Sequence, residues 1–145
     1  MHPSRSMVAT LAVIGATCAL PALTASQAAT PAPKPGPYVD AKATIDMRVA
    51  KDRKTLTFID GSCFAGHVQD GVWKVSKLPI RHNAFTFNGH VKVLLVSPPH
   101  ASKVLTFRIN GRWTGARFTG SVSTSDAAVC ATRRFSAKFN AHPDA

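Results

Sequence analysis

The sequence predicts an all-β, single-domain protein: an antiparallel β-sandwich or, as the alternative, a small β-barrel. From Ala43 onward, apolar residues recur with a period of two, which is typical of half-buried strands. The candidate strands are short and separated by polar turns, and no stretch shows the apolar stripe of a helix. Two cysteines remain once an N-terminal export segment is set aside, which adds one expected disulfide to the fold.

The first 28 residues have the pattern of a secretory signal segment. Arg5 supplies the positive start, residues 7–20 form an apolar run, and small residues precede a cleavage site after Ala28, or after Ala29 as the alternative. The apolar run is shorter than the roughly 20 residues that span a bilayer, and no second candidate follows it. We therefore expect an exported protein, extracellular or periplasmic, without a transmembrane segment.

A proline-rich stretch follows the signal segment. Pro31, Pro33, Pro35 and Pro37 occupy alternate positions, where none of them can donate a backbone hydrogen bond. We therefore expect residues 29–42 to form a linker or disordered tail. Residues 43–145, about a hundred, are enough for one β domain with a single modest core.

The alternation of apolar residues places the strands of this domain. Asp60 and Asp70 are expected beside turns, where a carboxylate that accepts hydrogen bonds from the turn backbone accounts for them. The candidate strands cover residues 43–49, 56–58, 72–75, 78–81, 84–96, 103–113, 118–124 and 129–140.

Two Asn-Gly pairs, Asn88-Gly89 and Asn110-Gly111, raise the question of whether the chain turns there. A two-residue turn at the first pair would put aromatic and cationic side chains on one face. If the strands run straight through, every apolar residue of each stretch points the same way. We therefore predict that both pairs lie inside strands, with the glycines making room for a bulky side chain of a facing sheet.

The C-terminal third contains a strand with an internal glycine and an aromatic residue, a second strand with an internal glycine, a cysteine, and a final strand with an aromatic residue before alanine. The positions of this pattern are Phe107, Ile109, Gly111, Trp113, Gly115, Gly120, Cys130, Phe135 and Ala137. In this pattern the chain resembles a group of small exported bacterial proteins of uncharacterised function. The resemblance implies an antiparallel β-sandwich and supplies no catalytic residues.

Cys63 and Cys130 are an even pair in a chain expected to be exported, which favours a disulfide. Closing a loop of this length restricts the unfolded chain by roughly 4 kcal/mol. The alternative is that Cys63 acts as a nucleophile with His67 four residues later, but no orienting acid is evident.

The sequence offers no clear catalytic or metal-binding residues. It contains no Glu, and its seven Asp are scattered, so the paired carboxylates of a glycosidase have no obvious source. The histidines, among them His67, His82 and His90, lack metal-ligand spacing. We therefore assign no catalytic residue, no metal ligand and no cofactor.

Charge is the strongest functional signal. Without Arg5, 17 Lys and Arg oppose seven Asp, a balance of +10 that favours anionic partners. Strand parity predicts that Arg108, Arg112, Arg134 and Lys138 point away from the core, and we call these four residues the basic face.

Two function classes remain open. The first is an exported, non-enzymatic module that binds an anionic polymer or cell-envelope component through the basic face, with nucleic acid an unlikely partner because of export. The alternative is a small secreted hydrolase that uses His, Asp and Ser side chains brought together by the fold.

Overall fold

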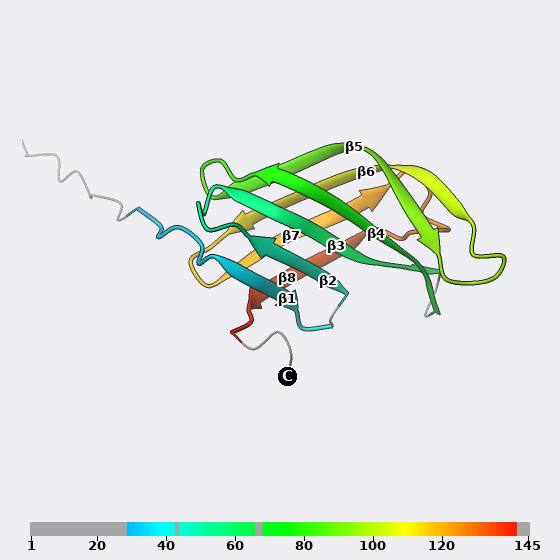
Figure 1. Ribbon diagram of the computed structural model, residues 1–145, viewed down its shortest axis with the longest axis horizontal. Helices are drawn as coiled ribbons and strands as arrows, with labels where there is room; N and C mark the ends of the chain where they lie inside the picture. The colour runs from blue at the N-terminus through cyan, green and yellow to red at the C-terminus, as the bar shows by residue number, and fades with distance from the viewer. Residues whose placement is uncertain (1–28, 43, 66–67, 142–145) are drawn as a thin grey trace, which may run out of the picture.

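The computed structural model describes residues 29–42, 44–65 and 68–141, and in this part of the chain it contains strands and no helix (Figure 1). The expected signal segment, residues 1–28, lies outside the described residues. Each strand pairs with its neighbours in an antiparallel manner, and the order β1 to β8 closes into a barrel. The strands are β1 (Gly36–Asp40), β2 (Ile45–Val49), β3 (Thr55–Ala65), β4 (Val68–Pro79), β5 (Ala84–Leu95), β6 (Ser102–Trp113), β7 (Arg117–Thr124) and β8 (Arg133–Phe139).

The predicted all-β antiparallel class is confirmed, and of the two predicted architectures the structure has the barrel. Closure depends on β1, which pairs with both β2 and β8. In an open sandwich two sheets would have free edges, whereas pairing between the first and last strands removes them.

The stretch expected to be a linker, residues 29–42, supplies this closing strand. Tyr38 of β1 is fully buried, and its hydroxyl donates a hydrogen bond to the carbonyl of Lys34 (3.0 Å). Further back, the Trp113 indole donates to the carbonyl of Pro31 (2.8 Å). Pro37 lies just before the β1–β8 ladder, which begins at Tyr38, and its carbonyl accepts a hydrogen bond from the Asn140 amide (3.0 Å), so only its missing N–H is left out at that edge. The β domain therefore begins before residue 43.

Strands β3 and β4 are longer than the sequence predicts. Asp60 lies inside β3 and Asp70 inside β4, so neither flanks a turn. The two short strands expected at 72–75 and 78–81 belong largely to the single strand β4. Lys77 interrupts the alternation there with a φ of 59°, and Ser76 and Lys77 are both exposed.

Both Asn-Gly pairs lie inside strands, as predicted. Asn88 of β5 is opposite Arg108 of β6, and Asn110 of β6 is opposite Thr86 of β5, so the two strands form one continuous ladder. Phe85, Val91 and Val93 are buried and Phe87 packs against the core, whereas the alternate residues Thr86, Asn88, His90 and Lys92 are exposed.

Interior glycines face aromatic rings, but no ring comes from a facing sheet: at Gly111 and Gly120 it comes from the neighbouring strand, and at Gly89 from Phe87 of the same strand. Gly111 is opposite Phe85, and a Cβ there would collide with the ring. Gly120 is opposite Phe135 and would place a Cβ 2.7 Å from its Cζ. In each pair the glycine leaves space over its strand that the ring fills.

The predicted disulfide between Cys63 and Cys130 is confirmed, with a Cα–Cα distance of 4.5 Å. Cys63 lies in β3, and Cys130 lies in the loop between β7 and β8. The disulfide therefore joins β3 to the β7–β8 loop, and Cys63 carries no free thiol that could act as a nucleophile.

The ladder between β4 and β5 is the shortest in the barrel. It contains the pairs Gly71–Leu95 and Val72–Leu94, and a single bridge, Arg81–Ala84, closes the turn. Between these ends the two ribbons diverge (Figure 1). We call this stretch the β4–β5 seam.

Candidate functional site

All four residues of the basic face are exposed on the outside of the barrel, as strand parity predicts. Arg108 and Arg112 project from β6, and Arg134 and Lys138 project from β8. Strand β7 lies between these two strands and pairs with both along its length. The four cations therefore share one outer surface.

The outward side chains of β7 are mostly hydroxyls, because Phe118, Gly120 and Val122 occupy the inward positions. Cross-strand pairing arranges the outer surface in rows, each row two residues from the next. In order, the four rows contain Arg108 and Ser123, then Arg134 and Ser121, then Arg112 and Thr119, and finally Lys138 and Arg117.

Side-chain hydrogen bonds order this surface. The Asn110 amide donates to Ser121 Oγ at 3.0 Å, and the Arg117 guanidinium donates to Ser136 Oγ at 3.2 Å. Strands β6, β7 and β8 contain no Asp or Glu. Within the described residues the two ion pairs are Lys74–Asp60 and Lys103–Asp126, so none of the basic face has a carboxylate partner there.

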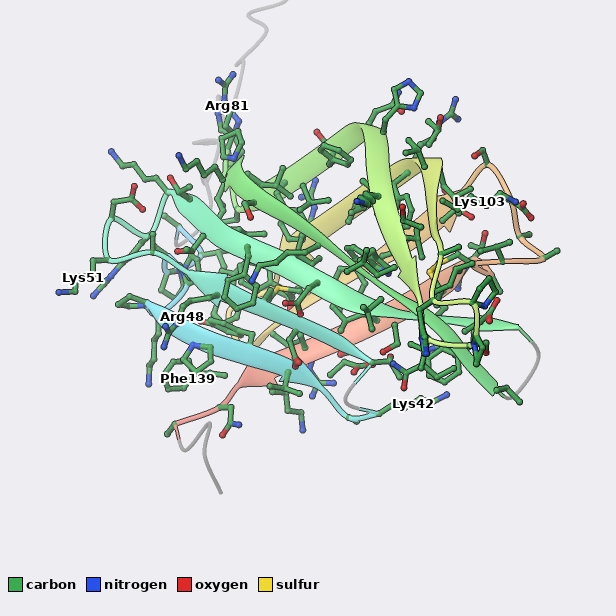
Figure 2. The ribbon with its side chains drawn as sticks, turned by 45° about the vertical axis from the view of Figure 1, so that its right-hand side comes forward. Lys42, Arg48, Lys51, Arg81, Lys103 and Phe139 are labelled. Carbon is green, nitrogen blue, oxygen red and sulfur yellow. A yellow bond between two sulfur atoms is a disulfide. The ribbon has the colours of Figure 1, made fainter. Side chains whose placement is uncertain are left out.

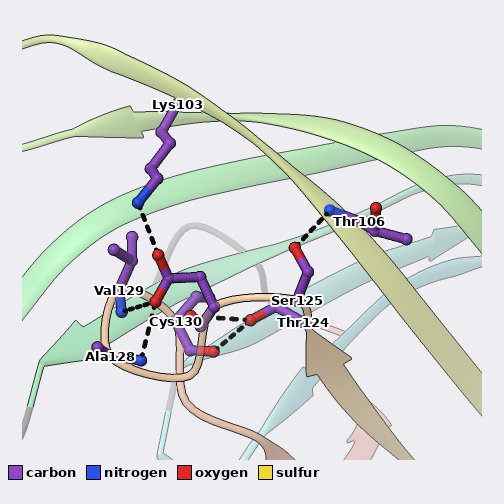
Figure 3. A network of polar contacts seen from close by, with 8 residues as sticks. Lys103, Thr106, Thr124, Ser125, Ala128, Val129 and Cys130 are labelled. Atoms are coloured by element: carbon purple, nitrogen blue, oxygen red, sulfur yellow. Dashed lines mark hydrogen bonds and ion pairs between the residues drawn. The ribbon is translucent and has the colours of Figure 1, made fainter.

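A loop fixed by several hydrogen bonds borders the first row (Figure 3). The Asp126 carboxylate pairs with Lys103 Nζ at 2.6 Å and accepts hydrogen bonds from the amides of Ala128 and Val129. The hydrogen bond from Lys103 is the main cause that lowers the pKa of Asp126. Thr124 donates to the carbonyl of Cys130 at 2.7 Å, which ties the loop to the disulfide.

A hollow of about 240 Å³ lies between this loop and β6. Its lining contains one charged group, the Arg108 guanidinium, together with hydroxyl groups. Ser125 is held in place because its Oγ accepts a hydrogen bond from the amide of Thr106 at 3.1 Å. The lining residues are Thr106, Arg108, Ser123, Thr124 and Ser125.

The other side of the barrel has a different charge pattern. Asp46 of β2 and Asp60 of β3 are direct cross-strand partners in an open groove of about 580 Å³. Burial, and then the nearby Asp40 carboxylate, raise the pKa of Asp46. Burial, and then the Asp46 charge, raise the pKa of Asp60, while Lys74 at 3.8 Å opposes the shift. Lys74 and Lys92 line the same groove, so its charges are mixed.

The histidines considered for a hydrolase do not meet a carboxylate in the described part of the chain. His82 lies in the turn between β4 and β5. His90 projects from β5 toward the Thr106 hydroxyl, with 3.3 Å between Nδ1 and Oγ1. His67 lies outside the described residues.

The described residues provide neither clustered metal ligands nor a membrane-spanning helix. No group of three or more His, Cys, Asp or Glu side chains there has the arrangement needed to hold a metal ion. The same residues include no helix that is both long and apolar enough to pass through a membrane.

Sequence reasoning identified the four cations and a strand at 118–124, but it did not show that this strand lies between β6 and β8 and adds hydroxyls to the surface. Thr119, Ser121 and Ser123 alternate with the inward residues of β7, and this alternation was the available signal. Side-chain parity does not show which strands are neighbours, so it could not place β7 between β6 and β8.

Comparisons with protein-family models, curated proteins and solved structures found no match to this chain.

Proposed function

We propose that the protein is an exported, non-enzymatic binding module that holds anionic polymers on its basic face. The observation that carries this proposal is the outer surface of β6 to β8, where exposed cations flank a strand of hydroxyls. The absence of carboxylates from these three strands leaves the cations available to an external anion. The disulfide supports the exported part of the proposal, because such bonds persist in oxidising compartments.

The expected affinity comes from several weak contacts acting together. One exposed ion pair contributes about 0.2–1 kcal/mol, which is too little for a single contact to retain a polymer. Four such contacts on one polymer chain give a useful affinity, and their hydroxyl neighbours add hydrogen bonds to the anionic oxygens. Because the charges are exposed, salt screens them over about 8 Å at physiological ionic strength, and binding must weaken as salt rises.

The test is a double variant, Arg112→Ser with Arg134→Ser, measured for binding to heparin across a salt series. Both side chains point outward, so thermal stability should change little. We expect affinity at low salt to fall about tenfold, the equivalent of two lost contacts of about 0.7 kcal/mol each.

A matched control removes the same charge elsewhere. Lys51 projects from the turn after β2, at the far end of the barrel from Lys103 (Figure 2), and Lys54 is exposed in the same turn. Lys51→Ser with Lys54→Ser should reduce affinity by less than about threefold, through long-range charge alone. Equal losses in the two double variants, or binding that ignores salt, would refute the basic face as the site.

A further inference from the structure

We propose that the polymer held by the basic face is a linear phosphodiester chain whose backbone runs along β7. This inference rests on the proposed function and narrows its ligand from anionic polymers in general to one backbone chemistry. It is carried by the spacing of the four rows, the alternation of their cations, and the hollow beside Arg108.

The cations of successive rows alternate between the two sides of β7. Arg108 is on the β6 side, Arg134 on the β8 side, and Arg112 again on the β6 side. Each row is displaced from the previous one by two residues of strand, a rise of about 6.8 Å. Each cation is also about 4.8 Å to one side of β7, which is within reach of an arginine side chain.

A phosphodiester backbone repeats over the same distance. In a nucleic acid strand, and equally in a chain of glycerol phosphate, six single bonds separate one phosphorus from the next. Six backbone bonds are also the length of two polypeptide residues, which extend about 6.6–7.2 Å. A phosphodiester chain extended along β7 therefore presents one phosphate to each row without losing register.

The chemistry of the first three rows suits a phosphate. In each of them an arginine presents two parallel N–H groups that match two oxygens of a phosphate, and a hydroxyl of β7 donates a further hydrogen bond, while the fourth row offers the two cations Lys138 and Arg117. Ser121 is already oriented by the amide of Asn110, which donates to its oxygen and leaves its own O–H to donate. One phosphate in each of these three rows uses groups from two strands.

The hollow beside Arg108 provides the first position of this path. Its volume of about 240 Å³ has room for one phosphate group, and its lining combines the guanidinium with hydroxyls of Thr106, Ser123 and Ser125. The hydrogen-bonded loop that forms its rim is already ordered without a ligand (Figure 3). Ordering entropy at this end of the path is therefore small.

The decisive variant moves a charge without removing one. Asn110→Arg combined with Arg112→Asn exchanges two exposed neighbours on β6, so composition and net charge stay constant. The exchange transfers the cation of the third row to the second row, where Arg134 already lies. Alternation is lost, while the total positive charge of the surface is retained.

Binding is measured for three probes: poly(glycerol phosphate), oligothymidylate with the same number of phosphates, and heparin, whose sulfates are denser and differently spaced. We expect the exchange to weaken binding of both phosphodiester chains at least about fivefold and to change heparin binding less than twofold. A loss restricted to one phosphodiester chain supports the proposal and identifies that chain as the source. No loss for either chain, or an equal loss for heparin, overturns it.

A second variant guards against misfolding of the exchange variant. Thr119→Val keeps every charge and nearly the same shape but removes the hydroxyl of the third row. We expect about threefold weaker binding of the phosphodiester chains at an unchanged thermal midpoint, and unchanged binding would again count against the proposal. If heparin still binds the natural sequence in a salt-dependent manner, the proposed function survives failure of this narrower inference.

Discussion

Breaking the disulfide between Cys63 and Cys130 should remove a large part of the stability of the barrel. The bond closes a loop with a sequence separation of 67 residues. In the chain-entropy model such a loop restricts the unfolded state by about 4 kcal/mol at 25 °C. With a denaturant dependence of about 1.3 kcal/mol per molar urea, the unfolding midpoint should fall by about 3 M.

The assay compares urea unfolding of the oxidised protein, the reduced protein, and the variant Cys63→Ala with Cys130→Ala. Both cysteines are at most 3% exposed, so the alanines also remove buried sulfur atoms. The reduced protein retains these atoms and reports mainly the cross-link, whereas the additional loss in the variant reports packing. A midpoint change below about 0.5 M on reduction would contradict the loop-entropy reasoning.

Two further predictions concern a charge and a glycine. Asp46→Asn should raise the unfolding midpoint at pH 7, because the raised pKa of Asp46 means that its ionised form destabilises the fold above that pKa. This gain in stability should vanish below about pH 3.9, where the carboxyl is protonated in both the folded and the unfolded state. Thermal melts at pH 7 and pH 3 measure the gain, with Asp70→Asn as the control variant. A gain that persists at pH 3 would contradict the prediction. Gly120→Ala should cost about 1–3 kcal/mol, because its Cβ would lie 2.7 Å from Phe135 Cζ and 2.8 Å from the Gly111 Cα. Gly89→Ala meets only the tip of the Phe87 ring, at 3.0 Å, and should cost less in the same urea titration; the reverse order would argue against ring packing over the glycine.

Side-chain parity predicted the regular parts of the fold from the sequence. It placed Asn88 and Asn110 inside strands and the basic face on the outer surface, because a shift by one residue would bury charges. The prediction failed at β1, because the four alternating prolines of residues 31–37 indicated a linker. The structure uses Pro37 at a position that needs no N–H from it, and burial of Tyr38 outweighs the preference for an isolated extended chain.

The candidate site was predictable in composition but not in arrangement. Periodicity indicates which side chains of a strand face outward, and Arg108 and Arg134 followed directly from it. It does not indicate which strands are neighbours, so the position of β7 between them required the structure. Asp60 was predicted beside a turn, but it lies inside β3, where the next residue, Gly61, lies under Trp73 of β4.

Because the β4–β5 seam is so short, the barrel is mechanically a curled sheet whose edge strands, β4 and β5, are joined only at the two ends of the seam. Force or thermal agitation acts first on the few hydrogen bonds at the ends of the seam, since every other pair of neighbours shares a longer ladder. The disulfide holds β3, next to one edge of the curl, to the loop after β7. This covalent link does not depend on the seam, so the β4–β5 ladder can open while strands β6 to β8, which carry the basic face, keep their curvature.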